Sequence, residues 1–228
     1  MAKHSTFGQK VVDYHFNLSS DWKLPLNVQL IYPFDDPLVQ NVFSDFYFKY
    51  FDDSYSRHFL FGINPGRFGA GVTGVPFTDP LIIQSICGIT NNFKKKNELS
   101  AIFVYDFINE LGGPKEFYSN FYITSICPLG FTKDGKNYNY YDDTILYQKV
   151  KSHIIDNIQS QKEFGCLDDV AFCMGKGKNL KFMNELNKEH QFFKKIVPLP
   201  HPRWVMQYRL KSKQEHLDTY VKELSSVL

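Results

Sequence analysis

Apolar positions recur at helical spacing along several segments of the chain. After Asp36-Pro37, every fourth residue is apolar from Leu38 to Tyr50, and an aspartate cap followed by a first-turn proline is a typical helix start. Asp79-Pro80 repeats that start signal before a short apolar segment. The same periodicity predicts helices over residues 81–86, 100–111, 142–160 and 180–188, and a last helix that uses Leu217, Tyr220, Val221 and Leu224.

Short apolar or β-branched runs alternate with these helices. They span residues 58–63, 120–126, 169–174 and 195–199, and they are followed by Asn-Pro-Gly, Cys-Pro, Gly and Pro, respectively. Strands that alternate with helices predict a three-layer α/β/α sandwich with a small, mainly parallel four-stranded sheet. Because the loops after parallel strands share one rim, we expect Asn64, Ser125 and His201 to converge.

The length favours one domain that spans residues 1–228. We expect a helical N-terminal cover over residues 1–50, a core over 58–210 and a C-terminal helix over 211–228. In the cover, apolar residues from Tyr14 to Ile31, Leu26 included, are expected to pack on the domain.

Charge and cysteine usage narrow the function classes. The net charge is +2, so a polyanion must meet a local basic patch on this chain. The four cysteines form no CxxC pair, so we expect no metal site and no cofactor. No apolar stretch approaches the length of a membrane span, and the start lacks a signal-peptide core. We therefore expect an intracellular monomer without membrane contact.

The stretch from Arg57 to Pro80 is the strongest candidate for a site. It contains five glycines around a single amide side chain, Asn64, directly after a predicted buried strand. Glycines leave main-chain N–H groups uncovered for a flat polar ligand, whereas the alternative is a long surface loop. The chain has no GxSxG elbow, no HExxH motif and no nucleotide fingerprint in which GxGxxG directly follows a strand.

An amide and an imidazole at strand ends suit one kind of hydrolysis. An amide such as Asn64 cannot deprotonate water, but it can hold a water by hydrogen bonds. That suffices when the bond being broken ionises largely by itself, as the N-glycosidic bond of a deaminated nucleotide does. His201 could then donate a hydrogen bond to the base oxygen on which charge collects.

The run from Gly62 to Phe77, with GINPG, FG and TGVPF, resembles the first motif of the single-strand-selective monofunctional uracil-DNA glycosylases, G-M-N-P-G-P-F-G-x-x-x-T-G-V-P-F. Residues 121–131, with Cys127-Pro128, are similar to the strand before the base-reading loop of that family. His201-Pro202 resembles the second motif, H-P-S-P-R. A second register, in which Leu199 takes the place of the histidine, is also open.

The resemblance implies a uracil-DNA glycosylase fold, DNA as the partner and base excision repair as the process. It implies that Asn64 positions the attacking water, that the main-chain N–H of Ile63 binds a base oxygen and that His201 stabilises the leaving base. Phe77 would stack on the flipped base, and Gly66 would leave room for substituents at C5 of the base.

The chain departs from the family pattern at the residue that reads the base edge. The family has an asparagine two residues before the Cys-Pro, where this chain has Ser125. A hydroxyl makes fewer directed bonds than an amide, so uracil would be held less selectively and xanthine becomes conceivable.

Candidate DNA contacts flank both motifs. Glycosylases need a wedge that fills the gap left by an extruded nucleotide, and cations for the phosphates. The candidates are Arg67, Lys176, Lys178, Arg203, Trp204, Met206, Tyr208 and Arg209. Two other functions stay open: a hydrolase of free nucleosides or nucleotides, and a non-catalytic nucleic-acid binding module on the same fold.

Overall fold

A parallel four-stranded sheet forms the centre of the molecule. The computed structural model describes residues 5–228. The strand order is β3-β2-β6-β7, and all three pairings are parallel. The strands are β2 (Arg57–Gly62), β3 (Phe121–Ser125), β6 (Cys166–Met174) and β7 (Lys195–Leu199). The four predicted strands are thus confirmed, although β6 begins before the predicted residue 169.

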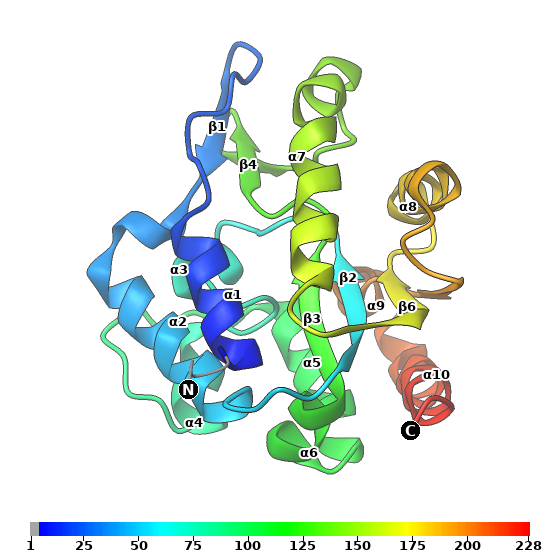
Figure 1. Cartoon of the computed structure of the whole chain (residues 1–228). Coiled ribbons are helices and arrows are strands. Elements are labelled where there is room, and N and C mark those ends of the chain that lie inside the picture. Colours follow the sequence, from blue (N-terminus) through cyan, green and yellow to red (C-terminus); the bar gives the residue numbers. More distant parts are fainter. Residues whose placement is uncertain (1–4) are drawn as a thin grey trace.

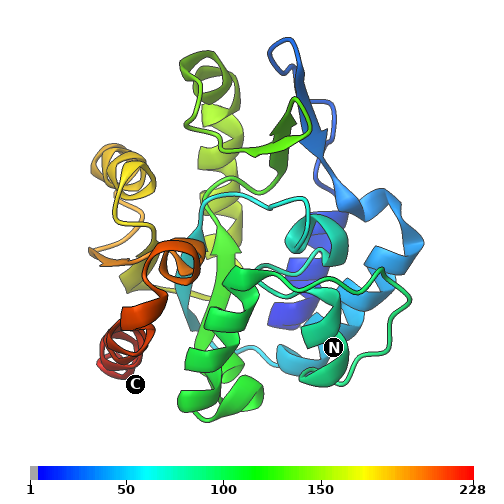
Figure 2. The same cartoon turned by 180° about the vertical axis from the view of Figure 1, so that it is seen from behind.

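Helices cover both faces of this sheet, which confirms the predicted three-layer α/β/α sandwich. One face is covered by α1 (Phe7–Phe16), α7 (Thr144–Lys162) and α8 (Lys178–His190) (Figure 1). The other is covered by α5 (Leu99–Glu110), α6 (Gly113–Asn120), α9 (Pro202–Tyr208) and α10 (Lys213–Ser225) (Figure 2). Helix α2 (Pro37–Tyr50) packs against α1, and the short helices α3 (Ala70–Thr73) and α4 (Pro80–Ser85) follow β2.

Aspartate side chains start three of these helices, as the sequence predicts for two of them. Asp36 and Asp79 accept hydrogen bonds from backbone N–H groups in the first turns of α2 and α4, each beside a proline at the first helical position. Asp143 does the same for α7. Each cap satisfies N–H groups that have no partner within the helix, so the local sequence fixes where the helix begins.

A second, antiparallel sheet was not predicted. It consists of β1 (Val28–Ile31), β4 (Gly130–Lys133) and β5 (Lys136–Tyr138), in the order β1-β4-β5. Asp134 and Gly135 join β4 to β5 with φ of 51° and 69°, the paired positive values of a tight hairpin turn. This Asp-Gly pair was a readable hairpin signal that the periodicity analysis did not use.

The N-terminal cover also differs from its prediction. It contains β1 as well as the helices α1 and α2, and the bounds of α1 were not predicted. Outside this cover, α6 was not predicted. Leu26 is 88% exposed, so its expected packing on the domain is wrong. At the other end, residues 202–225 form two helices, α9 and α10, separated by a 3-10 turn over Leu210–Ser212. Within residues 5–228, no helix combines the length and the apolar character that crossing a membrane requires.

A buried arginine joins the start of β2 to the surrounding helices. The Arg57 side chain is fully buried and forms two hydrogen bonds of 2.9 and 2.7 Å with the Asp53 carboxylate. Its Nε donates to the Tyr118 carbonyl, and its guanidinium lies 4.6 Å from the Phe7 ring centre. The charge is thus paired and hydrogen-bonded, as a buried ion must be.

The two sheets meet where Gly130 touches the loop after β2. A Cβ on Gly130 would lie 2.1 Å from the Pro65 carbonyl oxygen, which is a backbone atom that cannot turn away. Only glycine fits this contact, so the position of residue 65, next to Asn64, depends on it.

We expect Gly130→Ala to destabilise the fold by at least about 2 kcal/mol, because the new methyl group must displace the backbone at Pro65. Chemical denaturation measures the free energy of unfolding. Gly177→Ala is the matched control, since a Cβ there meets nothing within 4 Å. Equal stability of the two variants would contradict this account of the contact.

Candidate active site

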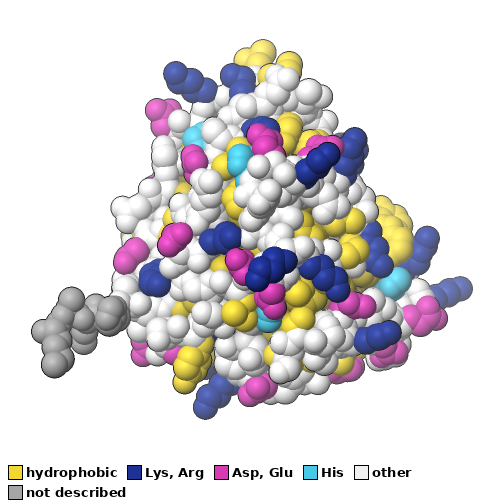
Figure 3. Space-filling view, turned by 45° about the vertical axis from the view of Figure 1, so that its right-hand side comes forward, with side chains coloured by type: hydrophobic (Ala, Val, Ile, Leu, Met, Phe, Trp, Pro, Cys, Tyr) yellow, Lys and Arg dark blue, Asp and Glu magenta, His cyan; other side chains and the backbone are white. Residues whose placement is uncertain are grey.

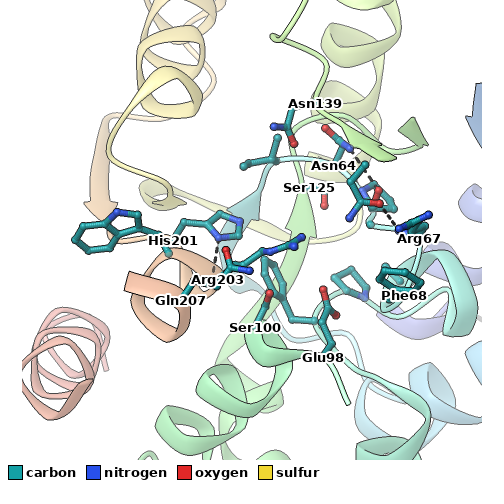
Figure 4. Close-up of a pocket in the computed structure, with 18 of the residues that line it drawn as sticks. Asn64, Arg67, Phe68, Glu98, Ser100, Ser125, Asn139, His201, Arg203 and Gln207 are labelled. Atoms are coloured by element: carbon teal, nitrogen blue, oxygen red, sulfur yellow. Dashed lines mark hydrogen bonds between the residues drawn. The ribbon is translucent and has the colours of Figure 1, made fainter. Parts of the chain in front are cut away.

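An open cavity lies at the carboxyl ends of the parallel strands, the usual place for ligands in α/β sheets. Its volume is about 630 Å³, within the range of small-molecule sites. Asn64, after β2, and His201, after β7, both line it, together with Ser125 at the end of β3 (Figure 4). The rim shared by distant strand ends therefore exists as the strand order predicts.

Most of the predicted site residues line this cavity. They are Ile63, Asn64, Gly66, Arg67, Phe77, Ser125, His201, Arg203, Trp204 and Tyr208. The predicted DNA contacts that do not line it are Lys176, Lys178, Met206 and Arg209. Lys176 is exposed on the loop before α8, and Met206 is half-buried against the core. Met206 therefore lacks the free side chain that a wedge requires.

The Asn64 amide is oriented by the backbone that follows β5. Its Oδ1 accepts a hydrogen bond of 3.2 Å from the Tyr140 N–H, and its Nδ2 donates to the Tyr138 carbonyl at 3.3 Å. Nδ2 also donates to the Pro65 carbonyl at 3.3 Å. The Tyr140 N–H can pair only with the amide oxygen, and the Tyr138 carbonyl only with the amide nitrogen, so the orientation of the Asn64 amide is fixed. Oδ1 keeps a second lone pair that can accept from a water.

Tyr140 links this amide to the main sheet. Its side chain is buried, and its hydroxyl donates to Asn179 Oδ1 at 3.0 Å. The Asn179 amide in turn donates to the carbonyls of Gly62 and Met174, at 3.5 and 3.4 Å, which end β2 and β6. A connected polar network thus fixes Asn64 relative to the strand ends.

His201 is held in one tautomer as the N-cap of α9. Its Nδ1 accepts a hydrogen bond of 3.1 Å from the Arg203 N–H, so the proton of the neutral ring is on Nε2. Burial, together with the smaller effect of the Arg203 charge, lowers the pKa of His201 to about 4. The ring is therefore a neutral donor at physiological pH.

The Phe77 ring packs between β2 and His201. A Cβ at Gly62 would lie 2.9 Å from this ring, and the ring centre lies 5.9 Å from that of His201. Phe77 also has φ of 52°, a left-handed backbone conformation that bulky residues rarely adopt. A strained aromatic held against a glycine and facing a cavity is a typical feature of a ligand site.

Ser125 is the last residue of β3, and its carbonyl takes part in a buried hydrogen-bond network. The Asn157 amide of α7 donates to the carbonyls of Ser125 and Ile126, at 3.1 and 3.0 Å. Tyr14 of α1 donates to Asn157 Oδ1 at 2.7 Å. The Ser125 backbone is thereby fixed, while its side chain lines the cavity.

Glu98 lines the cavity and was missed by the sequence analysis. Its backbone N–H donates to the buried Asp79 carboxylate at 2.8 Å. Burial and, to a smaller extent, the neighbouring charge of Asp79 raise the pKa of Glu98 to about 7, against the opposing effect of Arg203. No motif marks this glutamate, because it precedes a helix as many solvated residues do.

Polar residues from the unpredicted hairpin also line the cavity. Lys136, Asn137 and Asn139 all lie in or just after β5. The Asn137 side chain accepts from the Arg67 N–H at 3.1 Å, and the Arg67 guanidinium donates to the Gly135 carbonyl. Recognition of the Asp-Gly turn would have placed these residues near the glycine-rich loop.

Aromatic side chains on the cavity rim are paired with cations. Phe68 is 36% exposed, and Lys96 Nζ lies 3.6 Å from its ring centre. Trp204 is 40% exposed, and the Arg209 guanidinium lies 4.8 Å from its ring. Tyr208, at the end of α9, is 66% exposed.

Charge elsewhere on the molecule is mixed. On the face shown in Figure 3, Lys and Arg side chains alternate with Asp and Glu, in line with a net charge of +2. In the part of the chain from residue 5 onward, no three His, Cys, Asp or Glu side chains are gathered as a metal site would need.

Leu199 and His201, the two alternatives for the motif histidine, lie in different surroundings. Leu199 is fully buried on β7, opposite Met174 of β6. His201 lies two residues beyond, in the cavity lining. A side chain in the position of Leu199 therefore faces the core and has no access to a ligand.

Comparisons with known proteins agree with this arrangement. Residues 48–225 match the family model described as the uracil DNA glycosylase superfamily. The crystal structure of wild-type Pedobacter heparinus SMUG2 is 42% identical in sequence, with a TM-score of 0.95. The match covers 97% of this chain and 98% of that one. No curated protein matches the chain.

We expect the His201 ring to stay neutral until the pH approaches about 4. Because the folded pKa lies below the ordinary value of 6.5, the unfolded chain takes up this proton first as the pH falls. As the pH falls from 6.5 to about 4, the free energy of unfolding should therefore decrease by roughly 1 to 3 kcal/mol.

Heteronuclear NMR titration measures the pKa and the tautomer directly, with His201→Gln to assign the signal. Buried His15, whose pKa is also lowered to about 4 by burial, serves as an internal reference. A His201 ring that titrates near 6.5, or that carries its neutral proton on Nδ1, would show that the cap geometry does not hold in solution.

Proposed function

The chain belongs to the uracil-DNA glycosylase superfamily, and we propose that it is a monofunctional DNA glycosylase. It hydrolyses the N-glycosidic bond of uracil in DNA, leaves an abasic site and acts in base excision repair. The observation that carries this proposal is the shared cavity, in which an oriented amide and a neutral imidazole flank a strained aromatic ring.

Asn64 holds the attacking water. With both hydrogens of its Nδ2 donated to carbonyls, Oδ1 presents an acceptor of fixed direction to a water in the cavity. An amide is too weak a base to take the proton early. The reaction therefore suits a sugar that has already become an oxocarbenium ion, which a positioned water captures without prior deprotonation.

His201 stabilises the departing base. Its Nε2–H donates to the base oxygen on which negative charge develops. Its Nδ1 accepts the Arg203 N–H, and this bond, which caps α9, keeps the ring in that orientation. A neutral donor fits an anionic leaving group, because charge stabilisation needs a positioned dipole and no proton transfer. The main-chain N–H of Ile63 supplies a second donor to a base oxygen.

The walls of the cavity favour a broad range of deaminated bases. Phe77 stacks on the flipped base, a contact of about 1 to 3 kcal/mol. Gly66 adds no side chain on the C5 side of the base, where an added Cβ would meet no atom closer than 3.4 Å. Ser125 holds the base edge through a single hydroxyl, so xanthine is a further substrate.

The rim favours DNA over a free nucleoside. Arg67 and Arg203 supply cations for backbone phosphates, with Arg209 behind Trp204 and with Lys176 and Lys178 further from the cavity. Trp204 and Tyr208 are the candidate wedges, because exposed aromatic surface beside the cavity has no use in binding a mononucleotide.

We infer that the enzyme has no lyase activity and acts as an intracellular monomer. Lys136 is the lysine on the cavity lining, and it lies on the exposed hairpin at the rim. Treatment of the reaction with borohydride should therefore trap no covalent protein–DNA complex, and strand cleavage should require added alkali.

We expect Asn64→Ala to abolish most excision of uracil from an oligonucleotide, and His201→Ala to lower the rate by roughly 10² to 10³. Single-turnover kinetics followed by alkaline cleavage measure both rates. DNA affinity, from fluorescence anisotropy, should change little in Asn64→Ala. Lys222→Ala is the control, since this lysine of α10 is exposed and does not line the cavity. Absence of uracil excision by the wild type on single- and double-stranded DNA would refute the proposal.

Ser125→Asn should sharpen the preference for uracil over xanthine, because an amide offers both a donor and an acceptor to the uracil edge. The ratio of the two single-turnover rates is the measurement. An unchanged ratio in a folded variant would remove Ser125 from base recognition.

A further inference from the structure

Glu98 is the one carboxyl group that lines the cavity within residues 5–228. Its carboxylate lies against the loop after β2. A Cβ at Gly69 would be 1.8 Å from Oε2, and one at Gly66 would be 4.0 Å from Oε1. Two glycines thus leave space for an acid that the mechanism described above does not use.

The position of Glu98 is determined by its backbone. Its N–H donates to Asp79 Oδ2, while Asp79 Oδ1 accepts two N–H groups at the start of α4. Asp79 thus holds the Glu98 backbone, and the charged neighbours of the Glu98 carboxyl group are Asp79 and Arg203. Figure 4 shows the side chains of Glu98 and Arg203 both reaching into the cavity.

The binding mode proposed above places Glu98 beside one edge of the base. With the sugar toward Asn64, uracil directs O2, and a purine N3, toward His201. The opposite side then faces the loop that carries Arg67 and Phe68, with Glu98 below it (Figure 4). On that side uracil has only C–H groups, whereas a purine has the N7 lone pair.

We propose that Glu98 is a catalytic residue for deaminated purines, which presupposes the glycosylase function proposed above: its protonated carboxyl transfers a proton to N7 of the base. The C1′–N9 bond breaks, and its electron pair goes to the base, which leaves neutral because N7 has been protonated. The water at Asn64 forms the new C1′–O bond and releases a proton to solvent. Glu98 is reprotonated from solvent.

The charged and polar groups that face Glu98 determine the pH range in which its carboxyl group is protonated. Asp79 on α4 opposes its ionisation, Arg203 on α9 favours it, and Ser100 on α5 adds a hydrogen bond to the ionised form. Arg67 is turned toward the Gly135 carbonyl, and Lys96 toward the Phe68 ring. With burial as the largest influence, the pKa of Glu98 is about 7, so the acid form is lost as the pH rises through neutrality.

Excision of hypoxanthine and of uracil by the wild type and Glu98→Gln tests this role. Single-turnover rates are measured between about pH 5.5 and 8, a range that brackets the pKa of Glu98. We expect the wild-type rate of hypoxanthine excision to fall as the pH rises through about 7. The rate of uracil excision should not show this fall. Glu98→Gln should slow hypoxanthine excision by about 10²-fold at low pH and remove its pH dependence, with uracil excision within about threefold of wild type.

Two controls separate proton donation from structure. Glu110→Gln, at the exposed end of the same helix, should leave both rates unchanged. A 7-deazahypoxanthine substrate, in which carbon replaces N7, should be excised equally by the wild type and Glu98→Gln.

Three outcomes would overturn the role of Glu98: equal losses on uracil and hypoxanthine, no loss on hypoxanthine, or a persistent wild-type advantage on the 7-deaza substrate. Uracil excision without any hypoxanthine excision by the wild type would also overturn it while leaving the proposed function intact. If the wild type excised neither uracil nor hypoxanthine, the proposed function itself would be refuted.

Discussion

The alignment of parallel strand ends at one edge of the sheet is the constraint on which the site depends. In the β3-β2-β6-β7 order, Gly62 pairs with Ser125 and Met174 pairs with Leu199, so all four strands stop at one level. The chain leaves the sheet at this level, and a different functional group lies at or just after the ends of β2, β3 and β7. An amide, a hydroxyl and an imidazole from distant parts of the sequence thereby line one cavity.

The two groups proposed for catalysis at this edge are uncharged and fixed in position. Asn64 is fixed by the backbone at residues 138 and 140, and His201 by its cap on α9. Both are neutral, so neither must shed a tightly bound water shell before it meets the substrate. Preorganised dipoles of this kind are the main source of electrostatic catalysis, because no reorganisation is required as charge develops.

Close backbone approaches make this positioning possible and limit what the sequence can change. Gly130 lies against the Pro65 carbonyl, and Gly62 lies against the Phe77 ring. Phe77 keeps a left-handed backbone because the threonines at residues 73 and 78 hold its loop by hydrogen bonds. Strain at the cavity is thus offset by hydrogen bonds within the loop that carries Phe77.

The sequence by itself determined the parallel strands, the capped helices and the convergence of Asn64, Ser125 and His201, because periodicity, Asp-Pro starts and strand-end topology are local signals. The resemblance to the glycosylase motif added the proposed roles of individual side chains. Only the tertiary structure decided which register of the second motif reaches the cavity, that the β4–β5 hairpin orients Asn64, and that Glu98 belongs to the site. These depend on contacts between residues far apart in the chain, and burial and a shifted pKa exist only once those contacts form.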